Sequence, residues 1–124
     1  MEFKIDTKDI YTLIIPVYGQ IDANLTEAVS KKRAELGQSV SQNLIIDLSS
    51  CTSGDAAAYH QLIKLHTDCY SQNHSIVFTH VNDSILEDFK KNNIDTALNI
   101  TPTLIEAIDI ISMEMLERDL LSEE

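Results

Sequence analysis

The sequence predicts one α/β domain with a mostly parallel mixed sheet, and three observations lead to this fold class. Residues 44–48 form a continuous apolar run with one late acid, which is typical of a strand covered on both faces at the centre of a parallel sheet. Short β-rich segments alternate with segments of helical spacing along the chain. The chain also opens with two β-rich segments that have no helix between them. Together these features predict the order ββαβαβαβα, with right-handed crossovers and an antiparallel strand near one side.

The first half of the chain is expected to supply a hairpin and a helix. Residues 3–5 alternate apolar and polar side chains, and residues 11–18 are rich in β-formers, so we expect two strands joined as a hairpin. Pro16 suggests an edge position or a bulge. Residues 24–40 place apolar side chains near helical spacing, which predicts an amphipathic helix. Gly37 lies near its end, where a left-handed cap would suit glycine.

After the central run we expect two more helices and two short strands before the last helix. Residues 75–79 form the next strand after a helix over residues 55–70, whose apolar stripe consists of Ala58, Leu62, Leu65 and Cys69. Asp83 can cap a helix that ends at Asn92 and Asn93. Residues 97–100 then form a shorter strand.

The last helix has a clear start signal. We expect Thr101 as its cap, proline at its first position, and a Thr-x-x-Glu capping box over residues 103–106. The inward side chains are expected to be Leu104, Ile108, Ile111 and Met115. Its outer face and tail are rich in acidic residues, which indicates a solvated helix face, with a docking surface for a basic partner as the alternative. We therefore expect a single domain over residues 1–115 and a frayed acidic end over residues 116–124.

Composition excludes several classes of partner. The net charge is -11, and the short cluster Lys31, Lys32 and Arg33 is typical of a solvated helix face, so we expect no nucleic-acid binding. The chain shows no secretory leader and no apolar run of membrane-spanning length, so we expect a cytoplasmic protein without membrane insertion. Cys51 and Cys69 form no CxxC pair, which favours two free thiols in a reducing compartment.

Signals for catalysis are weak. The sequence has no glycine-rich phosphate loop, no Gly-x-Ser-x-Gly and no His-Glu-x-x-His. His66 and Cys69 lie three residues apart and could share a helix face, but two ligands do not make a structural zinc site. Asp22 and Asp55 could be imagined as a carboxylate pair, yet helix capping explains both. We therefore expect a protein that is not an enzyme and that holds no cofactor or metal.

The loop after the central strand is the first candidate for a functional site. Partners of open α/β sheets meet the loops beyond the carboxyl ends of the strands, and residues 49–58 form such a loop. Asp55 can cap the second helix, while Ala56, Ala57 and Ala58 leave its first turn nearly bare. Another backbone can approach such a surface closely, which suits a protein partner better than a small substrate. An ordinary capped turn without a partner is the alternative.

A second candidate is the stretch from Gly19 to Asp22, directly before the first helix. Glycine at this place allows a sharp exit from the preceding strand. Asp22 either caps the helix or faces the same rim as Asp55.

The order of elements and three stretches resemble the STAS domain, the family of anti-sigma factor antagonists and of cytoplasmic domains of sulfate transporters. Gly19 to Asp22 resembles the family's Gly-x-Leu/Ile-Asp after its second strand. Residues 44–49 and then residues 54–58 resemble its central strand and its Asp-Ser-Ser-Gly turn, and residues 81–89 resemble its third helix. The resemblance covers about residues 1–115.

One departure from the family pattern is informative. In the bacterial antagonists, the second serine of the turn is phosphorylated by a cognate anti-sigma factor kinase, and the added charge releases the partner. The resemblance puts Ala57 at that position and Ala56 at the first serine, so the usual hydroxyl is absent. Ser53 and Thr52 lie close enough to be substitutes. Ala58 stands where the family usually has glycine, and we expect it to add a small bump to the contact surface.

The resemblance implies a regulatory protein-binding module. The partner would be a kinase-like anti-sigma factor or a partner-switching protein, bound without phosphorylation at Ala57. The alternative is an accessory or scaffold subunit of a transporter ATPase or of a multi-protein signalling complex. The expected partner-binding residues are Gly19, Asp22, Ser53, Gly54, Asp55, Ala56, Ala57 and Ala58.

Overall fold

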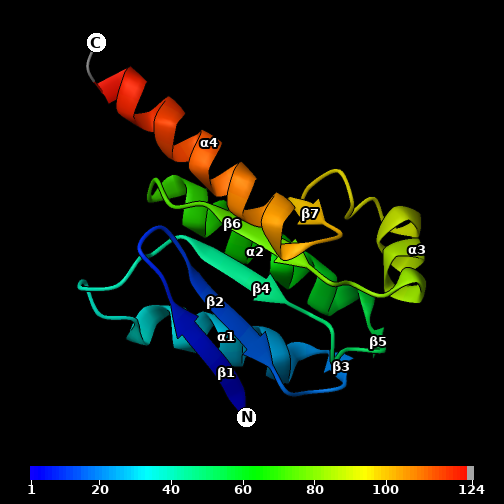
Figure 1. The fold of residues 1–124 in the computed structure, drawn as a ribbon. Helices are drawn as coiled ribbons and strands as arrows, with labels where there is room; N and C mark the ends of the chain where they lie inside the picture. Colours follow the sequence, from blue (N-terminus) through cyan, green and yellow to red (C-terminus); the bar gives the residue numbers. More distant parts are fainter. Residues whose placement is uncertain (123–124) are drawn as a thin grey trace.

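The computed structural model describes residues 1–122 and has the predicted mixed α/β architecture (Figure 1). In chain order the elements are β1 Phe3–Thr7, β2 Thr12–Pro16, β3 Gln20–Ile21, α1 Ala23–Glu35, β4 Leu44–Asp47, β5 Ser53–Gly54, α2 Ala56–Ser71, β6 Ile76–Thr79, α3 Asp83–Lys91, β7 Ile100–Thr101 and α4 Leu104–Ser122. The predicted order is confirmed, with β3 and β5 added as two-residue strands.

Five strands form the main sheet in the order β1-β2-β4-β6-β7. β1 and β2 are antiparallel and form the expected hairpin, whereas all later pairings are parallel. The apolar run predicted as the central strand is β4, which is buried along its whole length. Pro16 does not mark an edge strand, because β2 lies between β1 and β4. It is tolerated because the pairing of β2 with β4 involves only residues 12–14.

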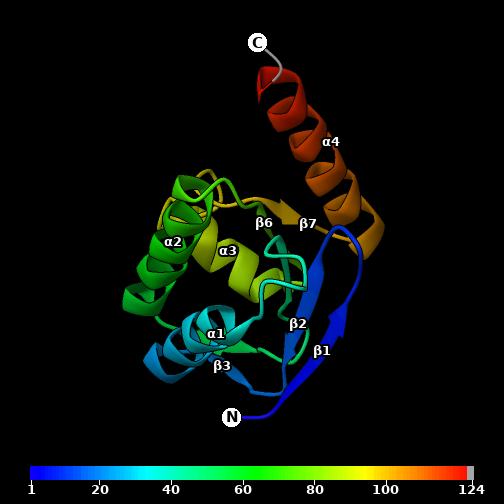
Figure 2. The same cartoon turned by 90° about the vertical axis from the view of Figure 1, so that its left-hand side faces the viewer.

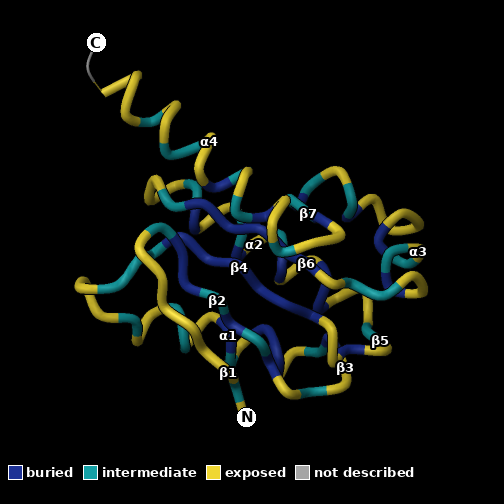
Figure 3. The backbone as a smooth tube through the Cα atoms, in the orientation of Figure 1, coloured by how far each residue is buried: buried dark blue, intermediate teal, exposed yellow. Residues whose placement is uncertain are grey.

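The two faces of the sheet are covered unequally. α1, α2 and α3 lie on one face and α4 alone lies on the other (Figure 2). The larger core, on the three-helix side, contains Tyr59, Phe78 and Phe89. Under α4 a smaller cluster joins Ala107 and Ile111 to side chains of β4 and β6. Burial is concentrated along β4 and β6, whereas β1 and the end of α4 are exposed (Figure 3).

Two helix ends differ from the expectation. α1 ends at Glu35, before the predicted residue 40, because Leu36 turns into extended backbone and its N–H bonds to the carbonyl of Arg33. Gly37 is not left-handed, since no glycine has a positive φ. The cap of α3 is Asn82, whose side chain accepts from the N–H of Ile85, and Asp83 is the first helical residue.

The segment before α4 is also shifted relative to the prediction. The last strand is Ile100–Thr101, while residues 95–97 form a turn. The Thr103 half of the capping box is confirmed, since Thr103 Oγ1 accepts from the N–H of Glu106, while the Glu106 carboxylate accepts from the Thr103 hydroxyl and not from its backbone N–H. The helix therefore starts at Leu104, and Thr101 is not its cap.

The inner face of α4 departs from the expectation, whereas the expectation for its tail is not tested. Ile111 is fully buried, but Leu104, Ile108 and Met115 are only partly buried, and Ala107 is the second fully buried residue. The helix extends to Ser122, and the expected fraying concerns residues that include Glu123 and Glu124, which lie outside the described part, so it stays a prediction. Within residues 1–122, no helix combines the length and the apolar character needed to cross a membrane.

Replacement of Ile111 by alanine tests how much the small cluster under α4 stabilises the fold. Ile111 is fully buried, so Ile111→Ala should lower the free energy of unfolding by about 2–5 kcal/mol through lost burial and a cavity. Ile105→Ala is the matched control on the same helix, because Ile105 is 73% exposed. Its effect should stay within about 0.5 kcal/mol in urea unfolding. Equal losses in both variants would show that α4 does not hold the sheet through this cluster.

Candidate functional site

The two candidate stretches, predicted separately, lie side by side in the fold. β3 and β5 pair in parallel, with Gln20 opposite Ser53 and Ile21 opposite Gly54. The N–H of Thr52 donates to the carbonyl of Gly19 at 2.9 Å, which extends the pairing by one residue. The turns before α1 and α2 therefore form one continuous rim, which we call the β3–β5 rim and define as residues 19–22 and 52–57.

Both aspartates of the rim are helix caps, as the sequence indicates. Asp22 accepts from the N–H of Leu25 at 3.0 Å, and Asp55 accepts from the N–H of Ala58 at 2.8 Å. Asp22 also accepts a hydrogen bond from the hydroxyl of Tyr18 at 2.5 Å, and this bond is the main cause that lowers the pKa of Asp22. The same bond raises the pKa of Tyr18. Each carboxylate therefore accepts a hydrogen bond from a backbone N–H in the first turn of a helix.

The first turn of α2 exposes two of the three alanines that were expected at the surface. Asp55, Ala56 and Ala57 are exposed, and neither alanine carries a hydroxyl. Ala58 is only 2% exposed and belongs to the larger core, so the expectation that it adds a bump to the contact surface is wrong. The helix turns this position toward the sheet, three residues after its cap. Ser53 and Thr52 are exposed.

Gly54 is required by a close approach rather than by an unusual backbone angle. A Cβ atom at this position would lie 2.6 Å from Cε1 and 2.8 Å from the hydroxyl oxygen of Tyr59, and 3.0 Å from Cβ of Ile21. Tyr59 cannot easily move, since its ring is buried and packs edge to face on Phe89 at 4.8 Å. The hydroxyl of Tyr59 donates to Asp88 at 3.1 Å. Burial is the main cause, and this hydrogen bond the second, that raises the pKa of Tyr59 to about 12.

Gly19 behaves differently from Gly54. A Cβ atom at Gly19 would meet no atom within 4 Å, and its φ is not positive. The expected sharp exit thus needs no glycine at this position. The contribution of Gly19 to the rim is its backbone carbonyl, which accepts a hydrogen bond from the N–H of Thr52.

The loop between β4 and β5 is fixed to its neighbours by groups that the sequence reasoning did not single out. Asn82 donates from its side-chain nitrogen to the carbonyl of Cys51 at 3.1 Å while it caps α3. The buried thiol of Cys51 donates to the carbonyl of Tyr18 at 3.3 Å. Burial raises the pKa of this thiol to about 11, which makes Cys51 a packing residue. Cys51 and Cys69 are both free, as predicted.

A hydrogen-bonded pair joins the carboxyl ends of β4 and β6. Nδ1 of His80 lies 2.9 Å from Oδ2 of Asp47, and Oδ1 of Asp47 accepts from the N–H of Ser49 at 2.8 Å. Burial favours the neutral acid, but the bonds from His80 and Ser49 outweigh it and lower the pKa of Asp47. His80 has a left-handed φ of 55°, unusual for a non-glycine residue. These interactions define the path of the chain as it enters the rim loop.

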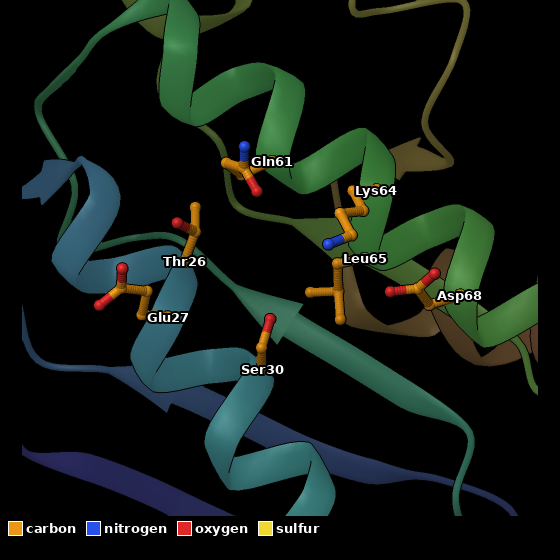
Figure 4. Close-up of a pocket in the computed structure, with 7 residues that line it drawn as sticks. All are labelled: Thr26, Glu27, Ser30, Gln61, Lys64, Leu65 and Asp68. Carbon is orange, nitrogen blue, oxygen red and sulfur yellow. The ribbon is translucent and has the colours of Figure 1, made fainter.

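A polar groove runs from the rim between α1 and α2. Its lining side chains come from both helices and face one another across it (Figure 4). Its volume is about 320 Å³. A second hollow of about 280 Å³ lies beside Asp55 and Ala57 and shares Thr26, Glu27 and Gln61 with the groove. The exposed turn and the groove therefore form one continuous surface.

The other chemical candidates do not converge. His66 packs against the ring of Tyr70, with centroids 4.6 Å apart, and burial lowers its pKa. Cys69 is buried in the larger core. Among residues 1–122, no three His, Cys, Asp or Glu side chains are grouped closely enough to hold a metal ion.

Substitution of the two glycines tests the constraint at the rim. Gly54→Ala places a methyl group against Tyr59 and should destabilise the fold by about 1–3 kcal/mol, because the ring or the β3–β5 pairing must shift. Gly19→Ala is the matched control, and its effect should stay within about 0.5 kcal/mol, because its site is open. The measurement is urea unfolding followed by circular dichroism. A Gly54→Ala variant as stable as Gly19→Ala would contradict the assigned role of Tyr59.

Comparisons with solved structures agree on the fold. A putative anti-sigma factor antagonist from Thermotoga maritima is similar with a TM-score of 0.72 at 14% identity, over 89% of this chain and 94% of that chain. A serine-to-glutamate variant of RsbS from Moorella thermoacetica is similar with a TM-score of 0.68 at 16% identity, over 95% of this chain and 99% of that chain. A sulfate transporter family protein from Wolinella succinogenes is similar with a TM-score of 0.73 at 11% identity, over 89% of this chain and 91% of that chain.

Comparison by sequence identifies the family. No curated protein matches the chain. The family model described as STAS domain, however, matches residues 4–107, which include the entire β3–β5 rim and every strand residue except Phe3. The chain belongs to the STAS domain family.

Proposed function

We propose that this chain is a regulatory protein-binding module of the bacterial cytoplasm that acts in transcription regulation, and that it does not catalyse a reaction. Its partner is a kinase-like anti-sigma factor or a partner-switching protein. The contact surface is the β3–β5 rim with the first turn of α2. The similar structure from Thermotoga maritima supports this direction, because that protein is described as a putative anti-sigma factor antagonist.

One observation carries the proposal most directly. Ala56 and Ala57 are exposed at the start of a helix whose cap, Asp55, is itself exposed. Small side chains at this place let a partner's backbone approach the helix closely, while Gly54 and Tyr59 keep the turn rigid from behind. A rigid surface loses little conformational entropy when it binds, which favours recognition without rearrangement.

The proposal includes binding without the phosphorylation known for the family. Neither Ala56 nor Ala57 has an oxygen that could accept a phosphate. Ser53 and Thr52 are exposed, but Ser53 lies in β5 and Thr52 donates from Oγ1 to the carbonyl of Gly19 at 3.4 Å. Both residues precede the helix, so a phosphate there would not occupy the place of Ala57. We infer that the rim stays in its binding state.

A second function is favoured by the similar protein from the sulfate transporter family. In this alternative the chain is an accessory or scaffold subunit of a transporter ATPase or of a multi-protein signalling complex, in which no phosphoserine is required. The same rim would serve as the contact surface. Genes neighbouring that of this chain separate the two functions, since sigma regulators favour the first and a transporter operon the second.

A charge placed at Ala57 tests the proposed contact surface. Ala57→Glu should weaken binding to a kinase-fold anti-sigma factor from the same genome by at least about tenfold, because it imitates part of a phosphate charge next to Asp55. An acid in the first turn interacts favourably with the helix dipole, so the fold should be retained. Isothermal titration calorimetry measures the affinity, and thermal unfolding checks the fold.

Two controls make the experiment decisive. Ala34→Glu adds the same charge at an exposed alanine of α1 and should bind like the unmodified chain. Ala57→Ser should also bind normally, and after incubation with the kinase and ATP its intact mass should show a phosphate that the unmodified chain lacks. Failure of the unmodified chain to bind any such protein would refute the proposal, and a phosphate on its Ser53 would refute the absence of a switch.

A further inference from the structure

α4 carries an apolar stripe on the side that faces away from the sheet. The stripe consists of Ile105, Met113, Leu116 and Leu120, with exposed fractions of 73%, 62%, 60% and 56%. These are among the few large apolar side chains that the described part of the chain leaves exposed. Because an α-helix turns about 100° per residue, Leu120 lies on the opposite side from Ile111, which is buried against the sheet. We call this set the outer stripe.

The outer stripe continues beyond the body of the domain. α4 has 19 residues, and its C-terminal end projects from the body of the domain (Figures 1 and 2). The side of α4 opposite the stripe still contacts the body there, through Glu114 to Tyr70 and through Arg118 to Ser75. Met113, Leu116 and Leu120 follow one another at spacings of three and four residues, which is the spacing of a helix seam. A helix with apolar side chains on both faces is normally covered on both.

The charges beside the outer stripe all have the same sign. Glu106, Asp109, Glu117 and Asp119 are exposed and lie within or next to it. Arg118 is the only basic residue of α4, and it points toward the body. Its guanidinium donates to Ser75 Oγ at 3.0 Å and to Asn43 Oδ1 at 3.3 Å. Nothing on this helix therefore neutralises the acids of the outer face.

This charge pattern decides between a second copy and another protein. Two copies paired through α4 would bring acid against acid, in a chain whose net charge is already -11. A helix with apolar residues flanked by lysine or arginine would match both the stripe and its border. We propose that the outer stripe is a docking site for a basic amphipathic helix of a partner protein, separate from the β3–β5 rim and additional to the function proposed for it.

A defined peptide probe tests this docking site, whichever protein is the natural partner. The probe is a synthetic amphipathic helix of about 18 residues with a leucine face and lysine flanks, and a second peptide carries glutamate in place of every lysine. Fluorescence anisotropy with the full chain should show that the lysine peptide binds at least about tenfold more tightly than the glutamate peptide. Higher salt should weaken the binding.

Variants of the chain separate the outer stripe from general attraction between opposite charges. Combined Met113→Gln, Leu116→Gln and Leu120→Gln keeps helix-forming side chains and the net charge, and should weaken binding of the lysine peptide at least about tenfold. The matched control combines Ile5→Gln with Val17→Gln, which removes exposed apolar side chains from elsewhere and should change affinity less than about twofold. Asp109→Lys with Glu117→Lys should reduce the preference for the lysine peptide, because only Glu106 and Asp119 of the four acids at the stripe remain.

Three results would overturn the proposal. The first is that the lysine peptide does not bind the unmodified chain. The second is that it binds the glutamine variant as tightly as the unmodified chain. Alternatively, sedimentation equilibrium would show a dimer of the unmodified chain that the glutamine variant does not form, which would identify a second copy as the occupant. Circular dichroism of the glutamine variant verifies that α4 is retained, so a loss of binding reports on the surface and not on the fold.

Discussion

The contact between Gly54 and Tyr59 is the constraint on which the β3–β5 rim depends. The ring occupies the space that any side chain at residue 54 would need, and Ile21 closes the same space from the neighbouring strand. This packing lets Ser53 and Gly54 pair with Gln20 and Ile21 and brings the starts of α1 and α2 together. Tyr59 also reaches α3 through Asp88 and Phe89. One buried ring of α2 thus connects the rim to α3.

Sequence reasoning succeeded where a pattern is local. The central strand, both aspartate caps and the Thr103 half of the capping box depend on side chains within a few residues of one another, and the structure has them all. Sequence reasoning left open whether the loop before α1 faces the same rim as the loop before α2. Their direct pairing as β3 and β5 was not predicted, since two-residue strands leave no periodic signal.

The errors arose where distant packing decides. The apolar stripe of the second helix, Ala58, Leu62, Leu65 and Cys69, is buried as predicted, but Ala58 was also assigned to the contact surface, although the third position after the cap faces the core. Asn82, rather than Asp83, caps α3 because its amide can accept from Ile85 and donate to the carbonyl of Cys51 at the same time. A carboxylate could not make the second bond. The role of Tyr59 was invisible too, because nothing near it in the sequence indicates that its ring lies over Gly54.

The absence of a hydroxyl at the start of α2 has a physical consequence for regulation. The N–H of Ala58 is already satisfied by Asp55, so the helix start does not need an added anion for its stability. At the proposed contact surface a phosphate would act only by repulsion, and Ala57 has no hydroxyl that could carry one. If the rim keeps one state, regulation has to enter at another surface. The outer stripe of α4 suits this role because it lies away from the rim, so a partner bound there would leave Ala56 and Ala57 accessible. Such a chain would connect two proteins instead of switching between them, and its occupancy would depend on the concentrations of both.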